Sequence, residues 1–204
     1  MSVDWFRRLA DVPDVGYQGS PGIDPGTLKG HAVEPTLGEF PSDVRVDDLA
    51  RKQYLSWPSG SSPAHERAIF DQKHMSTEEV LRNIAEALEL PGQPRDYHFA
   101  IQLAAEALWN RRRAEPEVLD EVERLCWLDI RLVEALPSTI RVEPISDGTF
   151  AMVAAFKILV TLYEREGAIR EALEVAVLAE GFGQHAEKAE ELRERLAVLE
   201  AEDA

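Results

Sequence analysis

One glycine constrains this chain more than any other residue, because it separates two helical runs that have no linker between them. In "LVTLYEREGAIREALEVAVLAEG", residues 159–181, a run of helix formers ends at Gly167 and a second run starts directly after it. Glycine adopts the left-handed conformation that ends many helices at little cost, whereas most other residues do not. The sequence therefore predicts a tight antiparallel hairpin and not one long helix.

Apolar side chains follow helical spacing on both sides of this glycine. Before it, residues at i, i+3, i+4 and i+7 share one face: Phe156, Leu159, Val160 and Tyr163. After it, a second stripe is rich in alanine, and small side chains allow two helices to approach closely: Ile169, Ala172, Leu173, Ala176 and Ala179.

This hairpin resembles one tetratricopeptide repeat, over about residues 153–186. The sequence departs from the family pattern at Val160, where a small residue is usual, and at Ala176, where an aromatic is usual. Glycines replace the terminating proline, and a second copy in register is not found upstream. The residues that match the family in type and spacing are Phe156, Leu159, Tyr163, Gly167, Ile169, Ala172 and Ala179.

The resemblance implies a ligand groove, because the first helix of each repeat lines the concave surface in this family. The same positions share one face at about 100° per residue, and they form the polar stripe of an otherwise apolar helix. This stripe faces either water or a ligand. The positions are Ala154, Lys157, Thr161, Glu164 and Arg165.

From about residue 62 onwards the chain is expected to be all-α. Ser62-Pro63 begins one helix, and Ser76 with Glu79 forms the capping box of another. The body is expected to be a helical-hairpin bundle or a short tetratricopeptide-like solenoid spanning residues 61–204. Further helices are expected at 95–113, 116–136, 149–166, 168–181 and 185–201.

Residues 1–60 differ from the rest, because they are rich in proline and glycine and follow no helical or strand period. Scattered aromatic residues nevertheless favour an irregular arm that lies across the helical body, with short helices near residues 4–11 and 47–56. A disordered tether is the alternative.

The formal net charge of -16 argues against nucleic acid and anionic membranes as partners, and it favours a partner of basic character. No stretch is long enough to cross a bilayer, and the first residues lack the apolar core of a signal peptide. With a single cysteine, Cys126, the sequence suggests the cytoplasm.

Catalytic and metal-binding templates are not met. His65-Glu66 lacks a second histidine four residues after the first, and the five histidines are scattered. Phosphate-binding and dinucleotide-binding glycine motifs are missing as well. We therefore expect no cofactor, no metal and no catalytic residue.

Two residues break the pattern of the helix expected at 116–136. Asp129 falls within its apolar arc, so it must be paired, hydrogen-bonded or protonated. Trp127 lies on the opposite, charged side, which indicates a cover: the N-terminal arm first, then a partner protein, then simple exposure. Candidate partners for the carboxylate are His98, Tyr97, Tyr163 and Arg112.

The leading hypothesis is a non-enzymatic scaffold that binds a protein or peptide, with Trp127 as a contact beside the groove. The alternative is a small-molecule-binding bundle or enzyme that uses Asp129 with His98 or Tyr163. The last helix carries an apolar seam with an acidic opposite face, which suits the end cap of a solenoid or a homo-oligomer interface. The expected groove residues are Lys157, Thr161, Glu164 and Arg165, and the seam is Ala189, Leu192, Leu196 and Leu199.

Overall fold

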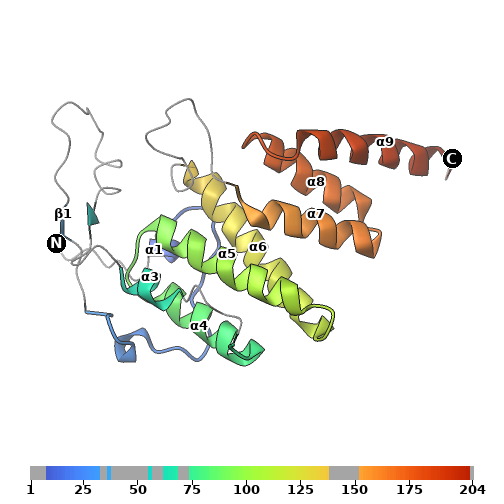
Figure 1. The fold of residues 1–204 in the computed structure, drawn as a ribbon. Coiled ribbons are helices and arrows are strands. Elements are labelled where there is room, and N and C mark those ends of the chain that lie inside the picture. Colours follow the sequence, from blue (N-terminus) through green and yellow to red (C-terminus); the bar gives the residue numbers. More distant parts are fainter. Residues whose placement is uncertain are drawn as a thin grey trace, which may run out of the picture.

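The computed structural model describes residues 8–32, 36–37, 55–56, 62–68, 74–137 and 152–202. This part of the chain is built from helices, with one short pair of strands, so the expected all-α class is confirmed (Figure 1). The helices are α1 (Arg8–Asp11), η2 (Pro25–Thr27), α3 (Pro63–Arg67), α4 (Thr77–Glu89), α5 (Pro94–Arg111), η5 (Pro116–Val118), α6 (Leu119–Ala135), α7 (Ala154–Glu166), α8 (Ile169–Glu180) and α9 (Ala186–Glu202).

The strands β1 (Thr36–Leu37) and β2 (Leu55–Ser56) pair in antiparallel orientation, with Thr36 opposite Ser56. The expected helix at 47–56 is therefore wrong at its C-terminal end, and its remaining residues lie outside the described ranges. The connection expected after residue 137 also falls mostly outside the described residues.

Local capping begins the helices where the sequence predicts. The Ser62 hydroxyl accepts a hydrogen bond from the backbone N–H of His65 at 3.0 Å, with Pro63 at the first position of α3. At α4, Ser76 Oγ accepts from the N–H of Glu79 at 3.2 Å, and Glu79 Oε2 accepts from the N–H of Ser76 at 2.7 Å. These bonds satisfy donors that a helix start leaves unpaired.

The start of α7 is later than expected, at Ala154 and not at residue 149. Val153 before it has extended geometry, and its N–H donates to Oε1 of Gln184 at 3.1 Å. The partner of this N–H therefore comes from the loop between α8 and α9, which a local sequence pattern does not reveal.

Gly167 ends α7 in the left-handed region, at φ 78°, and Ala168 N–H donates to Tyr163 C=O at 2.8 Å. The chain then reverses and α8 packs along α7, as the sequence predicts. Along the whole body each helix packs mainly on its neighbours in sequence, and α5 also packs on α3 and α7 (Figure 1). The core runs through these contacts, and its largest fully buried side chains include Tyr97, Phe156, Ile101 and Leu125.

The described part of the N-terminal arm, residues 8–32, is docked on the helices. Leu9 and Val15 belong to the core, at 2% and 0% exposed. Glu89 at the end of α4 accepts hydrogen bonds from the Tyr17 hydroxyl and from the N–H of Ser20. Residues Leu9 to Ser20 therefore contact the helical body, through two buried apolar side chains and the bonds to Glu89.

Candidate binding groove

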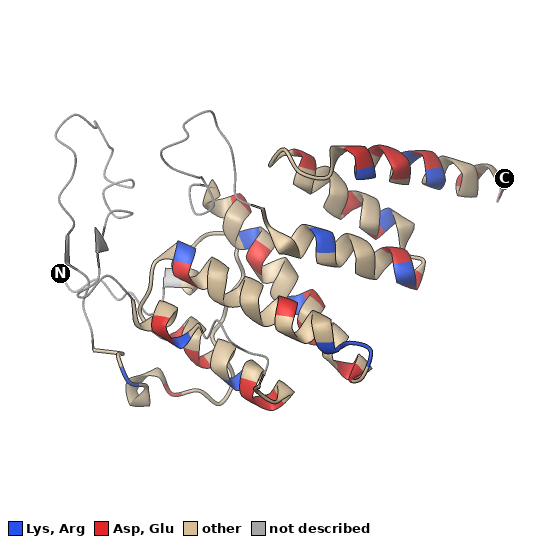
Figure 2. Ribbon diagram, in the orientation of Figure 1, with Lys and Arg blue, Asp and Glu red and all other residues tan. Residues whose placement is uncertain are grey.

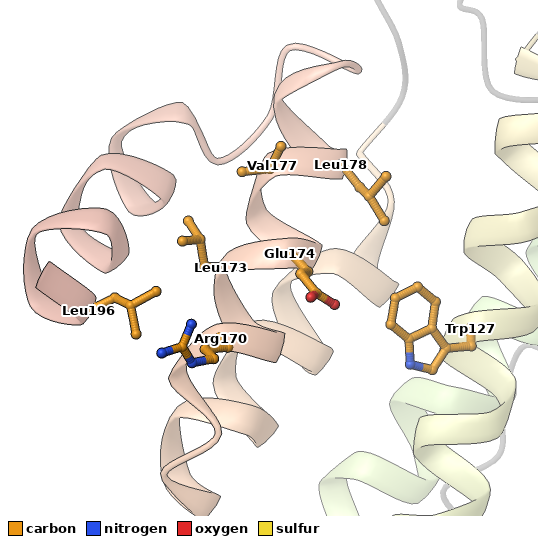
Figure 3. A pocket seen from close by; sticks show the side chains of 7 residues that line it. All are labelled: Trp127, Arg170, Leu173, Glu174, Val177, Leu178 and Leu196. Carbon is orange, nitrogen blue, oxygen red and sulfur yellow. The ribbon is translucent and has the colours of Figure 1, made fainter. Parts of the chain in front are cut away.

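A groove opens on the outer surface of α8, between α6 and α9, with a volume of about 590 Å³. Its long side is formed by α8, and single residues from the two flanking helices close its ends (Figure 3). The lining is mostly apolar, which distinguishes it from the charged surface around it. The residues that line it are Trp127, Arg170, Leu173, Glu174, Val177, Leu178 and Leu196.

The amino-acid pattern of α8 explains why this surface exists. Alanines and Val175 occupy the side that packs on the core, and Ala172, Ala176 and Ala179 are fully buried. Larger apolar side chains occupy the opposite side, at positions that share one face at about 100° per residue. Val177 is 42% exposed there. The exposed side of α8 is thus mixed, because Val177 lies there among charged residues, while Leu173 and Leu178 are partly buried against the core.

Trp127 is held in place at one end of this groove. Its indole Nε1 donates a hydrogen bond to the hydroxyl oxygen of Tyr163 on α7 at 2.8 Å, and that hydroxyl donates to Glu123 on α6. Burial raises the pKa of Tyr163 to about 12, and the hydrogen bond to Glu123 adds to the effect, so the phenol keeps its proton at neutral pH. The chain of two bonds fixes the indole in one orientation.

The described residues beside the half-buried side chain of Trp127 include Tyr163 of α7 and the groove residues of α8. Much of the N-terminal arm lies outside the described ranges, so the first expectation, a cover by the arm, stays a prediction. The tryptophan remains partly uncovered, because the groove leaves one side of it open. A partner surface, the second expectation, therefore stays a proposal.

The two charged residues of the lining have different surroundings. Arg170 forms an ion pair with Glu200 on α9, at 2.6 Å between Nη2 and Oε1. Glu174 is exposed, and its carboxylate points toward Trp127 (Figure 3). Within the described part of the chain Glu174 has no hydrogen bond or ion pair. Among the described residues, the groove therefore carries a carboxylate without a direct partner on the side that faces its aromatic ring.

The expected groove residues on α7 lie along that helix but contact the rest of the protein to different degrees. Lys157 is exposed, and the Thr161 hydroxyl donates to its carbonyl at 2.7 Å. Glu164 pairs with two cations of α9, Lys188 at 2.9 Å and Arg195 at 3.3 Å.

Figure 2 shows the Lys and Arg residues of α9 interspersed with Glu along the helix. The guanidinium of Arg165 lies 5.7 Å from the ring centroid of Trp109 on α5. The cations of α9 thus engage one of the four expected residues, Glu164, and the aromatic ring of α5 engages another, Arg165.

Asp129 is paired with His98, one of its four candidate partners. Nδ1 of His98 lies 2.6 Å from Oδ1 of Asp129, and each side chain is 1% exposed. Burial raises the pKa of Asp129, and the neighbouring imidazole acts in the opposite direction. His98 Nε2 and Asp129 Oδ2 are buried without a hydrogen-bond partner among the described residues. This contact joins α5 to α6 inside the core, away from the groove.

The described residues contain no group of three or more His, Cys, Asp or Glu side chains arranged to hold a metal ion. None of the described helices is both long and apolar enough to cross a membrane. Comparison with protein-family models, curated proteins and solved structures finds no match to this chain. The function must therefore be argued from the surface itself.

From the sequence we expected Trp127 to be a contact beside a groove on α7, and the outer side of α8 was not expected to form a groove. The signal was present in the sequence, because Val177 and Leu178 lie opposite the alanine stripe, where a helix exposed to water usually carries polar residues. The last helix was expected to contribute Leu196 to a seam, and Leu196 does line the groove.

Proposed function

We propose that this protein is a non-enzymatic helical scaffold and that the groove on α8 binds a helical segment of a partner protein. The observation that carries the proposal is an apolar groove of about 590 Å³ on a surface that is otherwise strongly charged. Exposed apolar surface with a charged rim is typical of protein-binding sites. The grooves that receive helical peptides in other systems have the same character.

The shape of the lining supports a helical ligand. Leu173, Val177 and Leu178 line the groove from α8, and Trp127 of α6 and Leu196 of α9 add apolar surface on either side. A second helix can pack in such a groove through residues at i, i+3, i+4 and i+7. Tryptophan is enriched among the residues that dominate binding energy, and Trp127 is already fixed before any ligand arrives.

The likeness to a tetratricopeptide repeat remains part of this proposal. In that family the first helix of the hairpin lines the ligand groove, which here would be α7 with Lys157, Thr161, Glu164 and Arg165. The groove on α8 belongs to the second helix, so the two surfaces are separate. We favour α8, because Glu164 already binds cations of α9 whereas the apolar side of α8 is open.

Burial of the His98–Asp129 pair favours a structural role over the enzyme alternative. Both side chains are 1% exposed, so a substrate would reach them only after α5 and α6 had separated. The single thiol, Cys126, is buried as well, and burial raises its pKa, so it suits a reducing compartment such as the cytoplasm without reacting.

A designed peptide tests the groove directly. The probe is a fluorescein-labelled amphipathic helix with leucines on one side and glutamines on the other, and its binding is followed by fluorescence anisotropy. Val177→Asp places a charge in the groove, and we expect it to weaken binding at least about tenfold. Val198→Asp on α9 is the matched control, because Val198 is 58% exposed and outside the lining. Equal binding by both variants would refute the proposal.

A further inference from the structure

We infer that the end of the groove formed by Trp127 and Glu174 is a seat for a cationic side chain, so that the partner is a basic amphipathic helix with an arginine at that position. The inference rests on the proposed function and specifies the chemistry of its ligand. It is carried by an aromatic ring and a carboxylate that both line the apolar groove, and this carboxylate has no partner within the described ranges (Figure 3).

The two groups are suited to one ligand group in particular. A guanidinium is attracted to the face of an indole and pairs with a carboxylate in a planar arrangement, whereas a lysine ammonium lacks that planar match. An aliphatic group would leave Glu174 without a partner, and an anion would be repelled by it. Arginine satisfies both the ring and the carboxylate at once.

Among the described residues, no cation pairs with Glu174 at this seat. Arg170 is the basic residue of the lining, and it pairs with Glu200 at 2.6 Å. The indole cannot turn away easily, because the bonds through Tyr163 to Glu123 hold it. The seat is therefore preorganised, and binding does not require an internal ion pair to break.

The charge of the whole chain supports the same ligand. With a formal net charge of -16, the protein attracts basic segments from a distance. A second copy of the chain would bring another -16 to the interface, which disfavours self-association through this surface. Figure 2 shows acidic residues distributed over the helices of the body, so this attraction is not confined to one end.

Three peptides test the seat. They share the leucine side of the neutral probe and differ at one flanking polar position, which carries Arg, Gln or Glu. We expect the Arg peptide to bind the wild-type protein about fivefold more tightly than the Gln peptide, and the Glu peptide to bind more weakly than either.

Glu174→Gln should remove most of the Arg preference, and Glu174→Lys should invert the order of the three peptides. The matched control is Glu194→Gln, which changes net charge equally at an exposed position of α9 with no ion pair in the described residues. The control should keep the full Arg preference. Because Glu174 is exposed, its variants should melt at the wild-type temperature.

The outcomes separate the two proposals. One outcome is that Val177→Asp abolishes binding while Glu174→Gln and Glu194→Gln show the same preference for the Arg peptide. That result would support the groove as the binding site and contradict the cation seat. If none of the peptides binds the wild-type protein, both proposals fail. If sedimentation shows a dimer that Val177→Asp dissociates and the Arg peptide does not displace, a second copy occupies the groove and the inference fails.

Discussion

At the scale of single residues, Asp129 occupies a position on α6 where every neighbour in the arc is apolar, and it meets His98 on α5 at 2.6 Å. Moving a carboxylate out of water costs several kcal/mol, and the attraction between buried partners offsets that cost only partly. Two of the polar atoms in the pair have no partner among the described residues. The pair therefore contributes more to the register of α5 on α6 than to net stability.

Replacing one partner should be more damaging than replacing both. Asp129→Ala should lower the free energy of unfolding by about 3–5 kcal/mol, because it leaves the imidazole of His98 buried without its acceptor. The double variant with His98→Leu should lose less than the sum of the single variants. Urea unfolding of the wild type, the two single variants and the double variant measures the coupling free energy between the two side chains. The labelling rate of Cys126, one turn before Asp129 and fully buried, reports opening of the same helix pair. Additive losses would contradict the pairing.

The pH dependence of the His98→Leu variant follows from the pKa of Asp129. Burial raises that pKa above 3.8, so the folded state holds the proton to a higher pH than the unfolded state does. The contribution of this carboxyl group to the free energy of unfolding is therefore complete below pH 3.8, and it is lost as the pH rises through the pKa of the folded state. Without the imidazole, which lowers this pKa, the decline should extend to higher pH than in the wild type.

The sequence shows that Asp129 must be buried, since helical periodicity alone places it in the apolar arc. It does not identify the partner, because four candidates have the right chemistry, three on the helix expected at 95–113 and one on α7. Tyr97 bonds to the carbonyl of Leu90 at 2.7 Å, and Arg112 lies over the ring of Trp109. Which candidate reaches Asp129 depends on how α5 rotates against α6, and that rotation is set by the whole interface.

At the scale of elements, the hairpin of α7 and α8 depends on the backbone conformation of Gly167. Its φ is 78°, and a Cβ added there would have no heavy atom within 4 Å. Substitution should therefore have a purely conformational cost. Gly167→Ala should destabilise the protein by about 1 kcal/mol, and Gly167→Asn should cost less, because asparagine adopts the left-handed region more readily. Thermal melting that ranks the two variants in the reverse order would contradict this account.

Caps and hairpins were predictable because each depends on residues close in sequence. Ser76 with Glu79, Ser62 with Pro63, and Gly167 all act within one helical turn, and the structure places each of them as expected. The exposure of the outer side of α8 was not predicted. It depends on how far α6 and α9 lie from α8, and no local pattern sets that distance.

At the scale of the whole molecule, a few polar contacts help to attach the N-terminal segment to the helical body. Tyr17 and Ser20 both donate to Oε1 of Glu89, which is 6% exposed, and the Ser20 hydroxyl also donates to the carbonyl of Ala85 at 3.4 Å. Burial raises the pKa of Tyr17, and the bond to Glu89 reinforces the shift, so the phenol remains a donor at neutral pH. The proline- and glycine-rich composition gave no sign of this attachment point.

Removal of the Tyr17 hydroxyl should therefore loosen this segment without unfolding the helices. In Tyr17→Phe, Glu89 keeps the Ser20 N–H as its one donor among the described residues, and a hydrogen bond to a charged group contributes about 1.5–3 kcal/mol. We expect faster amide exchange at Ser20 and faster proteolysis within residues 12–32, while amides of α7 and α8 exchange at the wild-type rate. Asp24→Ala is the control, because the Asp24 side chain bonds only to Gly26 within its own exposed turn among the described contacts. If Tyr17→Phe and Asp24→Ala increase exchange at Ser20 equally, Glu89 is not the attachment point, and burial of Leu9 and Val15 alone must hold the segment in place.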